Sequence, residues 1–232
     1  MSFPPITDAA TRKALLNRKI QLESRLRQHG ITDYPITHLQ YLQFDAAKFA
    51  SPFEVGCRLL CLCAAGFAAY GADERPAIVE WLQRENLWAH VSPREHELYD
   101  GAVTDEQQLE AFSWQEEGAY ILAWALGLIE AQPDPTIPVG EFQLDAFFSR
   151  VPMIGEPVSK FLESVELRDA AEIIDENLFN EVATTCFRDL WLSGQASASD
   201  LDATVSFERH KALNWLRRFA GITEWDHTDT AT

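Results

Sequence analysis

The sequence contains none of the short motifs that commit a chain to a familiar chemistry. No glycine precedes a lysine, so a glycine-rich phosphate loop is absent, as are the dinucleotide fingerprint, the G-x-S-x-G turn and the H-E-x-x-H zinc motif. The four cysteines form no C-x-x-C pair and have no zinc-site spacing. We therefore predict neither a cofactor nor a metal, and a reducing, cytoplasmic location.

Basic side chains are scarce. The chain has 19 Lys and Arg against 36 Asp and Glu, a net charge of −17. Phosphate backbones and anionic lipids repel such a chain, so we expect no nucleic-acid partner and no membrane partner. The charge either serves solubility or forms an acidic surface that matches a basic protein partner. The basic residues gather at 12–27 and 209–218, and we expect those two helices to pack beside acidic ones.

Long apolar runs are missing as well. The longest nearly apolar stretches, residues 59–70 and 119–129, are shorter than the roughly 20 residues that a membrane-spanning helix needs. The first residues lack a basic start followed by an apolar run, so no signal peptide is predicted. We interpret both stretches as central core helices, in which Cys57, Cys61 and Cys63 act as small hydrophobic residues.

Helix signals dominate what is present. Asp8 is a capping residue before a helix that runs to about residue 28, and Gly30 stops it. Leu15, Leu22 and Leu26 fall on one stripe of that helix. In contrast, Tyr34-Pro35 excludes a helix, and residues 39–44 are a candidate short strand.

Three serine-led capping sequences predict three further helix starts. Ser51 and Ser92 are each followed by proline and, three residues later, by glutamate. Ser113, followed by Glu116, predicts a helix through residue 129. Pro76 is suited to open a helix between the first two.

The second half of the chain gives its clearest helical period over residues 168–192. The repeating apolar positions there are Ala171, Ile174, Leu178, Val182, Cys186 and Leu190. Prolines end helical structure in 131–140, a break covers 151–157, and 193–202 is a polar loop. A last helix is predicted at about 207–220, with Leu213, Leu216, Phe219 and Ala220 inward, before a polar tail at 225–232. Residues 1–232 are thus predicted to form one mainly α-helical domain, an irregular bundle of about eight helices with little or no β structure.

Carboxylates are the main candidates for chemistry, and Glu117, Glu172 and Asp175 are the weak catalytic candidates. Arg168, Glu172, Asp175 and Glu176 share the helix face opposite the apolar stripe, and Arg168 is able to pair with Glu172 four residues on. A solvated face with a weak ion pair is the simpler interpretation. The alternative is a cleft in which crowded carboxylates supply an acid or a base.

Two histidine groupings and one cysteine carry weaker alternatives. His90 and His96 flank the Ser92 capping sequence, and Glu224 with His227 makes a single Glu-x-x-His pair, whereas di-metal bundles need two such pairs. Plain surface histidines are the simpler interpretation of both groupings. Cys186 lies on the inward stripe, and a buried thiol is inert.

Four stretches, in order, resemble the bacterial proteins grouped as domain of unknown function 4272. They lie at 113–127, 167–176 and 208–216, and at 225–230, where Trp225-Asp226 precedes Asp229-Thr230; the capped helix from Ser51 is also similar. The resemblance implies a helical bacterial domain, and no established activity comes with it. It points to Glu117, Arg168, Glu172, Asp175, Glu208, Arg209, Asn214 and Asp226. After Glu176 the family tends to an aromatic and arginine-bearing helix, and residues 177–183 of this chain lack that arginine.

We expect two functional classes to compete. The first is a non-catalytic acidic binding or regulatory protein of a bacterial cytoplasm, with Arg168, Glu208, Arg209, Asn214 and Asp226 as binding residues. The second is a carboxylate-dependent enzyme, such as a hydrolase, with a site between helices. Glu208, Arg209 and Asn214, with Trp215 and Trp225 beside them, are also suited to a buried hydrogen-bond network that holds the last helix and the tail.

Overall fold

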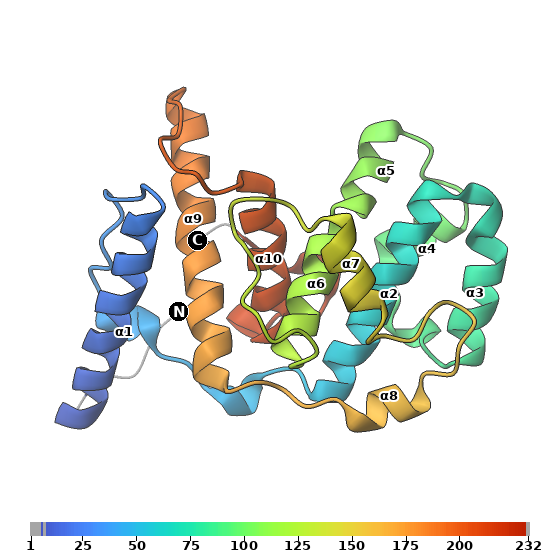
Figure 1. Cartoon of the computed structure of the whole chain (residues 1–232), viewed down its shortest axis with the longest axis horizontal. Helices are drawn as coiled ribbons and strands as arrows, with labels where there is room; N and C mark the ends of the chain where they lie inside the picture. The colour runs from blue at the N-terminus through green and yellow to red at the C-terminus, as the bar shows by residue number, and fades with distance from the viewer. Residues whose placement is uncertain (1–5, 7, 231–232) are drawn as a thin grey trace.

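The computed structural model describes residues 6 and 8–230 of the chain. Those residues contain helices and no strand, which confirms the mainly α prediction. The α-helices are α1 (Ala9–Gln28), α2 (Pro52–Tyr70), α3 (Arg75–Arg84), α4 (Pro93–Tyr99), α5 (Glu106–Ser113), α6 (Gln115–Ala125), α7 (Glu141–Phe148), α8 (Ser159–Ser164), α9 (Ala170–Ser193) and α10 (Ala203–Leu216). Helix α1 lies at one end of the molecule and α3 to α5 lie at the other (Figure 1).

Helices α2 and α6 form the centre of the larger hydrophobic cluster, as predicted from their apolar composition. The Ser51 capping box closes as expected, with the hydroxyl accepting from the Glu54 N–H and the Glu54 carboxylate accepting from the Ser51 N–H. By length and composition α2 is the one described helix able to cross a membrane, but 67% of its most apolar window is buried within this fold. Its three cysteines are buried and free.

A second hydrophobic cluster lies between α1 and α9. Leu15, Leu22 and Leu26 of α1 are buried there, as their stripe predicted, against Ile174 and Leu178 of α9. Helix α9 also packs along α10, which in turn packs on α6. The long central helix α9 therefore joins the α1 end to the α2–α6 core (Figure 1).

Two local predictions are wrong at the level of the backbone. Residues 39–44 hold a 3₁₀ turn, Leu39–Leu42, instead of a strand. Ser113 does not cap a helix: it is the last residue of α5, and its hydroxyl donates to the Glu110 carbonyl. Trp114 keeps helical dihedrals between α5 and α6, so the extended geometry that an N-cap needs is absent there.

Two helix ends also differ from the predicted positions. Helix α6 stops at Ala125, short of residue 129, because Gly127 has a φ of 70° and the Leu128 N–H turns back to the Ala123 carbonyl. Helix α10 starts at Ala203, earlier than predicted, because the Asp202 carboxylate accepts from the first free N–H groups.

Beyond α10 the chain leaves helical geometry at Arg218, whose φ is 53°. This turn leaves Phe219 half-buried and Ala220 exposed, so the inward prediction fails for Ala220. The tail is not uniformly polar either, because Trp225 is only 3% exposed and packs with its ring centroid 5.9 Å from that of Trp215. The tail's last residues, 231–232, lie outside the described residues.

Candidate functional site

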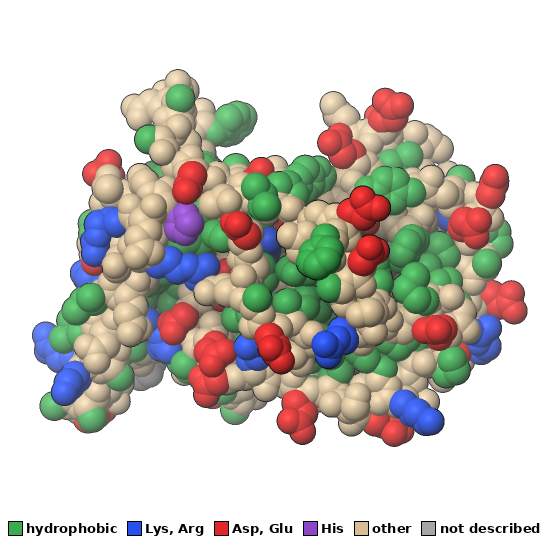
Figure 2. Space-filling view, viewed as in Figure 1, with side chains coloured by type: hydrophobic (Ala, Val, Ile, Leu, Met, Phe, Trp, Pro, Cys, Tyr) green, Lys and Arg blue, Asp and Glu red, His purple; other side chains and the backbone are tan. Residues whose placement is uncertain are grey.

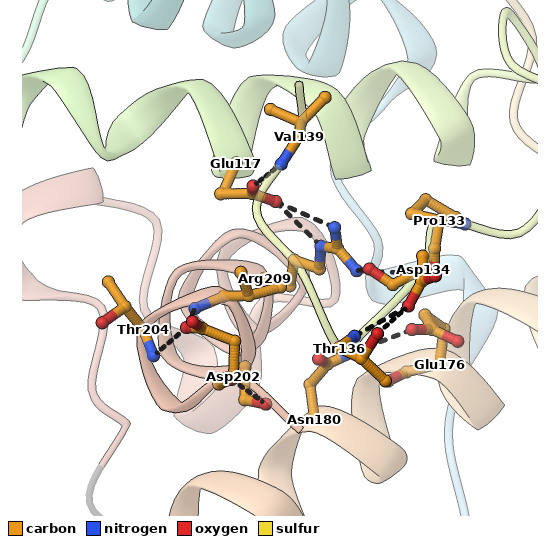
Figure 3. A network of polar contacts seen from close by, with 12 residues as sticks. Glu117, Pro133, Asp134, Thr136, Val139, Glu176, Asn180, Asp202, Thr204 and Arg209 are labelled. Carbon is orange, nitrogen blue, oxygen red and sulfur yellow. Dashed lines mark hydrogen bonds and ion pairs between the residues drawn. The ribbon is translucent and has the colours of Figure 1, made fainter. Parts of the chain in front are cut away.

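Glu117 and Arg209 form a buried ion pair between α6 and α10. Arg209 donates from Nε and Nη2 to Glu117 Oε2 at 3.1 and 2.9 Å, and both side chains are at most 2% exposed. Arg209 Nη1 also donates to the Asp134 carbonyl at 2.9 Å, and the Val139 N–H donates to Glu117 Oε1. Figure 3 shows the pair holding the 133–139 loop between the two helices. The pair thus shapes the loop that covers α6.

A second buried network, on the other side of α10, centres on Asn214. Its Oδ1 accepts from Asn177 Nδ2 at 3.1 Å, and its Nδ2 donates to the Asp229 carbonyl at 2.9 Å and lies 2.8 Å from His210 Nε2. Burial, and next the charge of Arg217, lower the pKa of His210 to about 3. A neutral His210 therefore accepts from Asn214, and the network holds the tail on α9 and α10. Of the three residues that the sequence placed in one network, only Asn214 belongs to this one, because Arg209 binds Glu117.

Arg168 acts on the end of α6. Its Nε donates to the Trp124 carbonyl at 2.5 Å and its Nη2 to the Glu130 carbonyl at 3.2 Å, so it joins the end of α6 to the segment that follows it. The predicted pair with Glu172 is present at 3.6 Å. Glu172 is exposed and does not line the pocket described below.

The prediction of a solvated face of α9 opposite its apolar stripe is wrong for Asp175 and Glu176, because α1, which packs on that stripe, also reaches both carboxylates. Arg18 of α1 binds Asp175 at 2.5 Å, and Arg25 binds Glu176, whose side chain is fully buried, at 2.6 Å. Burial raises the pKa of Asp175, and Arg18 opposes the rise. The basic helix α1 therefore packs on the acidic face of α9, which is the structural use of the charge asymmetry that the sequence predicted.

Glu208 and Lys211 of α10 lie on the side of the helix that faces α4 and the tail. Burial, and next the charge of Glu117, raise the pKa of Glu208, while burial lowers the pKa of Lys211. Lys211 Nζ lies 4.8 Å from the centroid of the Trp225 ring. Beside them, Asp226 accepts a hydrogen bond from the Arg94 N–H at 2.9 Å and so holds the tail on the start of α4.

The histidine groupings do not form metal sites. No group of three or more potential metal ligands occurs among the described residues. Glu95 instead pairs with the buried Arg58 of α2, and the His96 ring packs edge-on against Trp88, 4.5 Å between centroids. The Arg58–Glu95 pair was missed from the sequence because its partners are 37 positions apart and lie on different helices.

Burial raises the pKa of the Cys186 thiol, consistent with an inert group.

An acidic and aromatic pocket opens where the end of α2 meets α5, α6 and the 133–139 loop. Its volume is about 290 Å³, and its lining residues are Tyr70, Glu110, Ser113, Trp114, Glu116, Glu117, Pro138 and Val139. Glu117 is the one sequence-predicted site residue in it, and Glu172, Asp175 and Glu208 do not line it. Sequence reasoning missed Glu116 because its place after Ser113 suggested a capping role. We call this cavity the α5–α6 pocket.

A comparison with protein-family models matched residues 18–228 to the family described as domain of unknown function (DUF4272), and the chain belongs to that family. The resemblance seen in the four sequence stretches is thereby confirmed. Searches of curated proteins and of solved structures returned no match.

Proposed function

We propose that the protein is a non-catalytic binding or regulatory protein of a bacterial cytoplasm that recognises a basic protein partner through an acidic surface on α5 and α7. The supporting observation is how the charges are used. Eight arginines form ion pairs within the described part of the chain. Across those same residues, Glu106 of α5 and Glu141 and Asp145 of α7 are exposed and take part in no such pair.

The positions of these acidic residues favour recognition over general solubility. Figure 2 shows acidic side chains over α5 and α7, whereas basic side chains gather around α1 on the same face. Phe142, between Glu141 and Asp145, is 82% exposed and offers an apolar contact within the acidic surface. Charge complementarity of this kind accelerates association and rejects acidic competitors, and salt weakens it.

The test is affinity capture from a lysate of the source cells, followed by titration of the purified partner. The surface variant combines Glu106→Gln, Glu141→Gln and Asp145→Asn, and the control combines Glu74→Gln, Glu80→Gln and Glu163→Gln, three exposed carboxylates of other helices. We expect the native chain and the control to capture a basic protein that 1 M NaCl releases. Capture of nothing basic, or equal capture by the surface variant, would contradict the proposal.

One observation favours the second class, a carboxylate-dependent enzyme. Burial raises the pKa values of both Glu116 and Glu208, and Glu117 adds to each effect. A carboxyl group with a raised pKa is suited to general acid or base catalysis. A panel of ester, amide and glycoside substrates tests this class. Turnover that falls at least 100-fold in Glu116→Gln or Glu208→Gln would establish the enzyme, and no turnover across the panel would leave the binding protein.

A further inference from the structure

The α5–α6 pocket contains two carboxylates without partners. Both oxygens of Glu117 are engaged, by Arg209 and by the Val139 N–H. Glu110 and Glu116 have neither an ion pair nor a side-chain hydrogen bond to any described residue, yet both line the pocket. Glu110 is exposed, whereas Glu116 is half-buried. A half-buried anion without a counter-ion is costly, and a cation that enters the pocket would compensate the charge of Glu116.

Glu116 is half-buried, and it lines the pocket with its side chain against α2. Its Cγ and Oε1 lie 3.6 Å from the point where a Cβ on Gly66 would be, so the side chain rests against the backbone of α2. Burial, and next the charge of Glu117, raise the pKa of Glu116. The charge of Glu116 is therefore poorly solvated and is well placed to attract a positive group.

The aromatic lining of the pocket also suits a cation. Aromatic rings attract ammonium and guanidinium groups over their faces. In this fold Trp124, Trp215 and Trp225 already have an arginine or a lysine of the same chain within 5.0 Å of the ring centroid. Tyr70 and Trp114, which line the pocket, have no such cation among the described residues, and Tyr70 is 73% exposed.

We propose that the α5–α6 pocket receives an arginine or lysine side chain of the basic partner, with its charged group between Glu110 and Glu116 and against the rings of Tyr70 and Trp114. This inference deepens the proposed function and rests on it. The pocket's volume of about 290 Å³ accommodates one such side chain. The pocket would bind one side chain of the partner, while the acidic surface on α5 and α7 would attract the basic partner over a longer distance.

The first test uses small probes on the full chain. N-acetyl-arginine amide and N-acetyl-lysine amide are titrated to millimolar concentration, and the Trp114 indole N–H is followed by NMR, with N-acetyl-glutamine amide as the neutral control. We expect the cationic probes alone to shift this signal. Glu116→Gln and Tyr70→Ala should each weaken binding about two- to fivefold, because the first removes a negative charge beside the cation and the second removes an exposed aromatic ring. Glu163→Gln, an exposed residue of α8, should leave binding unchanged.

The affinity should also depend on pH, because protonation of Glu116 removes the negative charge that the cation meets. Binding should tighten as pH rises through the raised pKa of Glu116, and Glu116→Gln should remove that dependence. If all variants bind the cationic probes alike, or none of the probes shifts Trp114, the pocket proposal fails.

The captured partner separates failure of the pocket from failure of the proposed function. If Glu116→Gln and Tyr70→Ala bind it like the native chain while the α5 and α7 surface variant does not, the pocket is wrong and the proposed function stands. If no basic partner is captured at all, the proposed function fails whatever the small probes do.

Discussion

Replacing Arg209 by methionine tests whether the ion pair with Glu117 holds the fold together. The substitution keeps much of the apolar volume but leaves Glu117, 2% exposed, without its cation. It also removes the donor to the Asp134 carbonyl. Breaking a buried pair by removing one partner costs roughly 3–5 kcal/mol. For a chain of about this length each kcal/mol lowers Tm by roughly 2–4 °C, so the expected fall is roughly 6–20 °C.

The assay is urea unfolding followed by tryptophan fluorescence, with thermal unfolding beside it. Glu172→Gln is the matched control: its partner is also an arginine, but Glu172 is 58% exposed, so the expected loss is roughly 0–1 kcal/mol. The double variant Glu117→Leu/Arg209→Met should recover part of the loss, because it leaves no buried charge alone. A loss below about 1 kcal/mol for Arg209→Met, or a double variant as unstable as the two single losses added, would refute the reasoning.

Two further predictions concern the tail and the α9–α10 network. Trp225→Ala should cost roughly 3–5 kcal/mol in urea unfolding because the ring is 3% exposed, whereas Trp191→Ala, at 79% exposed, should change little; equal effects would mean that the tail is not part of the core. The pKa of His210 is lowered from 6.5 to about 3 in the folded state. The stability that the neutral His210 contributes is therefore fully present above pH 6.5 and is lost as pH falls toward 3. Unfolding at several pH values should show this slope in the native chain and a shallower one in His210→Gln, and identical slopes would contradict a buried neutral histidine.

Most of the helices were predictable because their signals are local. The Ser51 and Ser92 capping boxes close within four residues, and the Leu15–Leu22–Leu26 stripe needs no partner to be recognised. The failure at Ser113 is instructive. The same letters, serine followed three residues later by glutamate, lie here at the join of α5 and α6, because Trp114 continues the helical dihedrals. Capping is a matter of backbone geometry, which a pattern of residue types does not determine.

The candidate site was predictable only in part, because it depends on which distant charges meet. Glu117 and Arg209 are 92 positions apart, and the sequence around each residue does not indicate that they form an ion pair. Asp175 was a catalytic candidate with Glu117, and Glu208 was a binding candidate. In the structure Asp175 pairs with Arg18, and Glu208 lies half-buried on α10. Composition therefore indicated the acidic character of the molecule, whereas the fold decided which acids remain free.

The difference between residues that are paired within the fold and those that are not bears on which residues are free to bind a partner. Of the residues to which the family resemblance points, Arg209, Asn214 and Asp226 each hold a loop or the tail on a helix. A residue occupied in this way contributes to binding only by giving its neighbours their shape. Glu117 shows the connection: by fixing Arg209 and the Val139 N–H, it builds one wall of the α5–α6 pocket while its own charge is cancelled. In the proposed pocket, recognition of the cation would then depend on Glu110 and Glu116, whose carboxylates pair with no described residue. Variants at Glu117 should therefore lose stability and binding together, whereas Glu116→Gln should lose binding alone.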